Sequence, residues 1–203
     1  MKKVTLLFVF LILAQIIYSQ SSKTMDLPYR EIPDEYSETY TAGTVTARLL
    51  DGLGFRFYWA TDGLRPEDLS FKPNNKARTT EDTIDHILGL VRVVNNSANQ
   101  RPNINGKKYP ELDFQGKRKE TLVLIQEAAD ILRNSSAADF ENYTIIFKND
   151  KEQSEFPFWN QLNGPIADAL WHIGQIVSFR RSSGNPFASG ADKPSVFTGK
   201  VRN

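Results

Sequence analysis

Four segments of the chain carry apolar residues at the three- and four-residue spacing of an amphipathic helix. The buried face of such a helix repeats about every 3.6 residues, so each segment predicts one long helix with a polar outer surface. The predicted helices run from about Thr41 to Asp62, from Thr79 to Val94, from Phe114 to Asn134 and from Pro165 to Ser183.

The stretch from Asn163 to Pro186 has the clearest boundary signals. Residues 163–165 (Asn-Gly-Pro) predict the start, because proline is well tolerated as the first residue of a helix. Residues 183–186 (Ser-Gly-Asn-Pro) predict the end, and Arg180 and Arg181 complement the negative pole of the last turn. The apolar face of this helix consists of Ile166, Ala169, Leu170, Ile173, Ile176 and Val177.

The other helices carry further local signals. Thr79 and Asp82 are placed to form a capping box at the start of the second helix. Gly52 and Gly54 lie inside the first helix, where each costs about 1 kcal/mol relative to alanine. We expect these glycines to let a neighbouring helix approach closely. The apolar face of the first helix is predicted to consist of Val45, Leu49, Leu53, Phe57 and Ala60.

The connections between the helices differ in length and composition. Residues 64–78 contain two prolines and residues 95–110 are polar and rich in turn-forming residues, so both predict loops. Residues 143–147 (Tyr-Thr-Ile-Ile-Phe) favour an extended strand and are too few for a separate helix. The pattern predicts an all-α protein, a four-helix bundle with one long crossover connection and a short strand segment.

The two ends of the chain lie outside this predicted bundle of residues 41–187. Residues 1–20 begin with Lys2 and Lys3, followed by an apolar run from Val4 to Ala14. This is typical of a secretory signal peptide, and the run is shorter than the ~20 residues of a membrane-spanning helix. We expect an exported protein, periplasmic or extracellular, with no stable membrane insertion after cleavage. Residues 21–40 predict an extended arm and residues 188–203 a C-terminal tail.

Composition excludes several classes of function. The chain has no cysteine, which rules out disulfides, thiolate nucleophiles and cysteine metal ligands. The 25 basic residues nearly balance the 24 acidic ones and form no basic stripe, so nucleic acid is not an expected partner. With two histidines and no convincing nucleophile, a serine hydrolase is not expected either. Exposed helix faces leave a homodimer as an alternative to a monomer.

The two histidines and one acidic residue form the main chemical constellation. His86 and His172 each lie at the edge of an apolar helix face, and Asp168 lies one turn before His172. Two imidazoles and one carboxylate can bind one side of a divalent ion, most plausibly Zn²⁺ or Ni²⁺, and leave positions open. Alternatively, each histidine is a structural residue with one hydrogen bond, and Asp168 stabilises the first helical turn. Spacing alone leaves both interpretations open.

Three further residues are candidates for lining a pocket that binds a small molecule. Gln175 and Phe179 follow His172 on the same flank of the predicted helix. Trp59 lies in the first helix and is the third candidate. Trp159 and Trp171 could also line a pocket, although aromatic residues at helical spacing are often part of the core.

Three segments together resemble the DinB-like superfamily of four-helix bundles, and the chain looks like an exported bacterial member. They are residues 49–73 (LLDGLGFRFYWATDGLRPEDLSFKP), residues 80–90 (TEDTIDHILGL), and residues 158–186 with the sequence WHIGQIVSFRRSSGNP. The resemblance extends over about residues 42–187.

The resemblance implies a metal site. Many members of the superfamily carry one histidine on the second helix and a His-x-x-x-His pair on the last, and together these bind a divalent metal. By position, His86 matches the first of these ligands and His172 the last, whereas Asp168 stands in place of the first histidine of the pair. The related mycothiol-dependent maleylpyruvate isomerases resemble this arrangement more closely, with an acidic residue in a Glu-x-x-x-His motif.

The resemblance also implies a class of activity. Active relatives use the metal to activate a low-molecular-weight thiol, because a bound divalent ion lowers the pKa of a thiol or water that it coordinates. Such thiols are cytoplasmic, whereas this chain is expected to be exported. We therefore expect a metal-dependent transferase or hydrolase that acts on a small molecule. The alternative is a non-enzymatic binding or scaffold module with a degenerate site, in which His86 lies more than ~7 Å from the other two ligand atoms.

Overall fold

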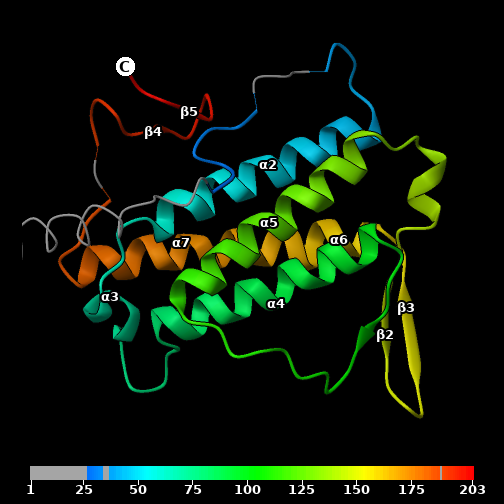
Figure 1. Cartoon of the computed structure of the whole chain (residues 1–203), viewed down its shortest axis with the longest axis horizontal. Coiled ribbons are helices and arrows are strands. Elements are labelled where there is room, and N and C mark those ends of the chain that lie inside the picture. Colours follow the sequence, from blue (N-terminus) through cyan, green and yellow to red (C-terminus); the bar gives the residue numbers. More distant parts are fainter. Residues whose placement is uncertain (1–26, 34–36, 188) are drawn as a thin grey trace, which may run out of the picture.

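The computed structural model describes residues 27–33, 37–187 and 189–203, and it is mostly helical with a few short strands (Figure 1). The predicted signal peptide, residues 1–20, lies outside the described residues. Within the described part, no helix has the length and apolar character needed to cross a membrane. The long helices are α2 (Ala42–Thr61), α4 (Thr80–Ala98), α5 (Phe114–Arg133) and α7 (Ala167–Ser182).

The long helices share one core. Helix α5 packs against both α2 and α4, and α7 also packs against both α2 and α4 (Figure 1). Each helix contributes small or branched apolar side chains to the contact, which lets the helix axes approach closely. Fully buried members of this core include Leu50, Leu53 and Phe57 of α2, Ile84 and Ile87 of α4, Leu122 and Leu132 of α5, and Ile176 of α7.

Side chains at the N-terminal end of α2 do not face the core as predicted. Leu53, Phe57 and Ala60 are buried, but Val45 is 53% exposed and Leu49 is 38% exposed. The buried face instead continues through Thr46, Ala47 and Leu50. Thr46 can occupy a buried position because its hydroxyl donates to the Ala42 carbonyl.

The predicted loops contain short elements that local patterning did not indicate. Helix α3 (Pro66–Ser70) lies within the first loop, and α4 continues to Ala98, beyond the predicted end at Val94. The predicted extended segment forms β2 (Ile145–Lys148) in a three-stranded sheet of order β1-β2-β3. β1 (Asn103–Ile104) pairs with β2 in parallel, and β3 (Gln153–Phe156) pairs with it antiparallel. A 3₁₀ helix, Ala138–Glu141, precedes this sheet.

The last long helix begins differently from the prediction. The chain is already helical at α6 (Trp159–Gln161) and passes through a π-helical turn, Leu162–Ile166, before α7. Gly164 has non-helical dihedral angles (φ −99°, ψ −109°), so the helix kinks there instead of starting there. Pro165 has no N–H to donate, which is compatible with such an interruption. π-helical turns of this kind are frequent at functional sites.

The described parts of the expected arm and tail pack against the helices. The ring of Tyr29 packs directly on Gly54, so this glycine admits the N-terminal segment and not, as predicted, a neighbouring helix. The C-terminal residues form a small hairpin of β4 (Pro194–Ser195) and β5 (Lys200–Val201).

The C-terminal hairpin returns to the N-terminal segment. The Ile32 N–H donates to the Gly199 carbonyl at 2.8 Å, and the Val201 N–H donates to the Glu31 carboxylate at 2.7 Å. Ile32 is buried in a small apolar cluster with Phe55 and Trp59 of α2. The two ends of the described chain therefore hold each other against one face of α2.

Candidate metal centre

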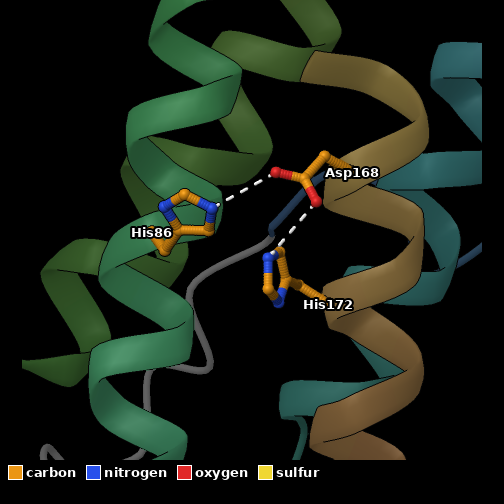
Figure 2. Close-up of side chains that lie close together, drawn as sticks. All are labelled: His86, Asp168 and His172. Atoms are coloured by element: carbon orange, nitrogen blue, oxygen red, sulfur yellow. Dashed lines mark hydrogen bonds and ion pairs between the residues drawn. The ribbon is translucent and has the colours of Figure 1, made fainter. Parts of the chain in front are cut away.

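Two helices bring His86, Asp168 and His172 together (Figure 2). The carboxylate of Asp168 lies between the imidazoles. Its Oδ2 is 3.3 Å from His86 Nε2, and its Oδ1 is 3.4 Å from His172 Nε2. The two rings meet edge to face, with centroids 4.6 Å apart. The structure thus places the three predicted ligands in a single cluster.

Local packing explains why these side chains point toward one another. On α4, Ile84 and Ile87 are fully buried, which turns the intervening His86 to the edge of the buried face. On α7, Ala169 and Ile173 are buried in the same way and leave Asp168 and His172 on the flank that faces α4 (Figure 2). The cluster therefore follows from the burial of neighbouring apolar residues.

Gln175 fixes the orientation of His172. Its side-chain oxygen Oε1 is 2.8 Å from His172 Nδ1, one helical turn from the cluster. An amide oxygen only accepts hydrogen bonds, so Nδ1 of His172 donates its proton to Gln175. In a neutral imidazole this leaves the lone pair on Nε2, the nitrogen that faces Asp168. Metal-binding histidines commonly have such a partner on the second ring nitrogen.

The spacing and chemistry of these atoms fit a divalent ion. Two ligand atoms that each lie ~2.1 Å from a tetrahedral ion are about 3.4 Å apart. Each histidine Nε2 lies at about this distance from one of the two Asp168 oxygens, 3.3 Å for His86 and 3.4 Å for His172. One nitrogen or oxygen of each residue lies within 4.8 Å of the others, so small side-chain rotations would complete the set. The separation of more than ~7 Å between His86 and the other two ligand atoms, expected for a non-binding module, is not found.

The cluster is partly open to solvent. The side chain of His172 is 14% exposed, that of His86 is 33% exposed and that of Asp168 is 41% exposed. Three protein ligands with an accessible side are typical of reactive metal sites, whereas structural zinc sites have four protein ligands and are closed.

The three predicted pocket residues have different locations. Gln175 contacts the cluster through His172, and the ring of Phe179 packs against Phe71, with centroids 5.9 Å apart. Trp59 lies elsewhere: it lines a separate cavity of about 530 Å³ together with Leu170 and Ile173 of α7 and donates its indole N–H to the Arg30 carbonyl. Trp59 therefore lines a cavity, as predicted for a pocket residue, but His86, Asp168 and His172 are not among the residues that line it.

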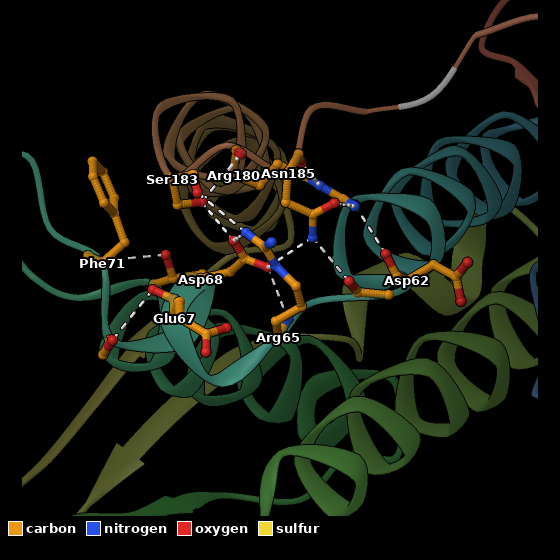
Figure 3. Close-up of polar contacts among 11 residues, drawn as sticks. Asp62, Arg65, Glu67, Asp68, Phe71, Arg180, Ser183 and Asn185 are labelled. Carbon is orange, nitrogen blue, oxygen red and sulfur yellow. Dashed lines mark hydrogen bonds and ion pairs between the residues drawn. The ribbon is translucent and has the colours of Figure 1, made fainter.

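Local sequence patterns did not reveal a polar network at the far end of α7 (Figure 3). The buried carboxylate of Asp68 forms an ion pair with Arg65 at 2.9 Å. It also accepts hydrogen bonds from the Ser183 hydroxyl at 2.6 Å and the Asn185 amide at 2.7 Å. The Arg65 side chain, followed by Ser183 and Asn185, holds the pKa of Asp68 well below its usual range.

Arg180 completes this network by capping α2. Its Nη1 donates to the carbonyl oxygens of Trp59, Ala60 and Asp62, at 3.2, 3.1 and 3.0 Å. The last carbonyls of a helix lack partners within the helix, so Arg180 satisfies the end of α2 while it belongs to α7. The sequence suggested only a favourable charge in the last turn of α7.

Comparison with known proteins gives evidence for the fold. No protein-family model matches the sequence, and no curated protein matches it. One solved structure, a DinB-like protein (YjoA) from Bacillus subtilis, is similar to it with a TM-score of 0.52 and 12% sequence identity. The match covers 77% of this chain and 98% of the other. At that identity the similarity concerns the fold alone, and the fold of this chain is DinB-like.

Proposed function

We propose that this protein is a four-helix bundle of the DinB type that binds one divalent metal ion through His86, Asp168 and His172. Zn²⁺ and Ni²⁺ are the ions that suit two imidazoles and one carboxylate best. The observation that carries the proposal is the meeting of these three side chains, from α4 and α7, at distances close to those around a shared ion.

The ion would act as a Lewis acid and lower the pKa of a water or thiol at its open position. The contribution of the chain is to hold and orient the ligands. Asp168 supplies one negative charge against the charge of the ion, and Gln175 keeps the Nε2 lone pair of His172 directed at the cluster. The exposed side of the cluster leaves room for a small substrate.

We propose a transfer or hydrolysis reaction on a small molecule, with water as the preferred nucleophile. The thiols that the resembling enzymes use are cytoplasmic, whereas the first twenty residues predict export. Water is available in any compartment, so a hydrolytic reaction fits both expectations.

Metal content tests the proposal directly. Protein purified without a histidine tag should contain close to one equivalent of a divalent transition metal by mass spectrometry. Metal-free protein should bind Zn²⁺ or Ni²⁺ with a stoichiometry of one in calorimetry. His86→Ala and His172→Ala should each weaken this binding by at least about 100-fold, more than the loss of an outer partner typically costs.

Asp85→Asn provides a matched control. Asp85 precedes His86 on α4, but its carboxylate pairs with Lys117 at 2.9 Å. Its loss should leave metal binding unchanged. Equal and negligible metal in the parent protein and in His172→Ala would instead support a non-enzymatic binding or scaffold module.

A further inference from the structure

A second cavity lies at the end of the molecule where α2 begins. It has a volume of about 610 Å³, is open to solvent on one side and is lined by the start of α2, the 3₁₀ helix Ala138–Glu141 and α6. These segments lie close together at the right of Figure 1. A volume of this size is within the range of small-molecule sites.

Aromatic rings dominate the wall of this cavity. Tyr40, Phe140, Phe158 and Trp159 all line it and come from three separate segments of the chain. Phe140 and Phe158 pack edge to face, with ring centroids 4.6 Å apart. Tyr40 is 96% exposed and Trp159 is 76% exposed, so two large rings have little protein contact of their own. Exposed aromatic side chains around a cavity indicate a binding surface.

The cavity wall carries a negative charge. Glu141 is the single charged residue among the described residues that line it. No cation in the described part of the chain pairs with its carboxylate. The hydroxyls of Thr41 and Thr46 bond within α2 and its cap. The wall therefore combines four aromatic rings with one negative charge that forms no ion pair among the described residues.

We propose that this cavity binds a small organic cation with apolar substituents, such as a quaternary ammonium group. The negative face of an aromatic ring attracts a cation, and cages of several rings are a recurrent solution for alkylated ammonium groups, which have no N–H to donate. Glu141 supplies the counter-charge, and the apolar wall accommodates the alkyl groups. Inorganic cations would lose much of their hydration shell and gain only one charged oxygen ligand, the Glu141 carboxylate, in return.

This site is independent of the proposed metal centre. None of the residues that line the cavity belongs to the His86, Asp168 and His172 cluster. Binding of the cation therefore needs no metal, and the two proposals can fail separately.

Acetylcholine and its uncharged carbon analogue, 3,3-dimethylbutyl acetate, form a matched pair of probes. They have nearly the same shape and differ by one positive charge. Titration into the full chain, followed by the NMR signal of the Trp159 indole N–H, should show saturable binding of acetylcholine and at least tenfold weaker binding of the analogue. Equal binding of both probes would show that the site is only an apolar cavity and would overturn the proposal. The absence of acetylcholine binding at about 10 mM would overturn it as well.

Variants locate the binding within the molecule, with calorimetry as the readout. Trp159→Ala should weaken acetylcholine binding about threefold to thirtyfold, the range of a single cation–π contact. Glu141→Gln should weaken it as well, while binding of the uncharged analogue stays the same. Trp171→Ala is the control, because Trp171 is equally exposed (74%) but lies outside the cavity. A loss in Trp171→Ala equal to that in Trp159→Ala would place the ligand elsewhere and contradict the proposal.

Discussion

Asp168 bridges two histidines with its two carboxylate oxygens. Its Oδ2 lies 3.3 Å from His86 Nε2 and its Oδ1 lies 3.4 Å from His172 Nε2. In the proposed ligand set, a carboxylate beside two imidazoles supplies one negative charge and a harder donor than a third imidazole would. Both changes favour ions that accept oxygen ligands alongside nitrogen, and they lower the preference for the softest metals.

Replacement of Asp168 by histidine should strengthen binding of Zn²⁺ and Ni²⁺ by about tenfold, in line with the preference of these ions for imidazole. Asp168→Asn should have the opposite effect, because a neutral amide oxygen is a poor ligand. Competition with a chelating dye measures both affinities. If Asp168→Asn bound metal as tightly as the parent protein, Asp168 would not be a ligand.

Gln175→Ala should weaken metal binding by about tenfold, the lower end of the effect of outer partners. The variant loses the acceptor for the Nδ1 proton of His172, so the proton can move to Nε2 and block it. Nitrogen NMR of the imidazole should show a larger fraction of the Nε2–H form in metal-free protein. Gln175→Glu, which keeps an acceptor oxygen, should restore the parent tautomer.

Ser178→Ala is the control for this prediction. Ser178 lies one turn further along α7, and its hydroxyl donates to the Gly174 carbonyl, away from His172. Reduced affinity with an unchanged tautomer in Gln175→Ala would assign the effect to general loosening of α7.

At the scale of elements, α2 contains a matched pair of glycines in different surroundings. A Cβ on Gly54 would collide with the ring of Tyr29, whereas a Cβ on Gly52 would meet only the flexible end of Arg56, at 3.2 Å. Replacement of glycine by alanine is therefore expected to change the free energy of unfolding in opposite directions at these two positions.

Gly54→Ala should lower the free energy of unfolding by about 1–3 kcal/mol, the usual cost of overpacking. Gly52→Ala should raise it by up to about 1 kcal/mol, because alanine is the better helix former. Urea denaturation of both variants checks the pair. A loss of stability in Gly52→Ala as large as in Gly54→Ala would show that the Tyr29 contact is not the cause.

The Asp68 network joins α3, α7 and the end of α2, and its charge makes stability depend on pH. The folded-state pKa of Asp68 lies below the value of about 3.9 expected for an unfolded chain. The ionised carboxylate therefore stabilises the fold above about pH 4, and this contribution is lost as the pH falls through the folded-state pKa.

Asp68→Asn should lower the free energy of unfolding at pH 7 by about 2 kcal/mol, the scale of buried hydrogen bonds to a charged group. The difference between variant and parent should shrink as the pH falls below about 4, where the unfolded carboxyl is protonated. Urea denaturation at pH 7 and pH 3 measures both values. Asp130→Asn, at a position that is 62% exposed, should show neither effect.

The elements that the sequence predicted well are those set by local periodicity. The long helices follow from their apolar stripes, and Asp168 and His172 were identifiable because they lie a single turn apart. His86 was identifiable from its place at the edge of an apolar helix face and from the family resemblance. The Asp68 network escaped prediction because its partners Ser183 and Asn185 are 115 and 117 residues away. Likewise, Gly54 indicated a close approach, but no local pattern specified that Tyr29 makes it.

In the molecule as a whole, residues 27–33 and the C-terminal hairpin form a second packed layer on α2. Ile32 lies between Phe55 and Trp59 of that helix and Gly199 of the C-terminal hairpin. The Lys200 ammonium donates to the Ile32 carbonyl at 2.8 Å, which adds a polar contact to the apolar one. None of these residues belongs to the proposed metal cluster, so the layer contributes to stability separately from the site.

Ile32→Ala should lower the free energy of unfolding by about 2 kcal/mol, because it removes a buried side chain and leaves a cavity under the hairpin. Metal affinity of the folded variant should equal that of the parent protein. Phe197→Ala is the matched control, since Phe197 belongs to the same hairpin region but is 97% exposed. The free energy of unfolding of this variant should equal that of the parent protein. Urea denaturation and metal titration of both variants decide the outcome. If Ile32→Ala weakened metal binding without a loss of stability, the packed layer on α2 would be coupled to the proposed metal centre and would not be independent of it.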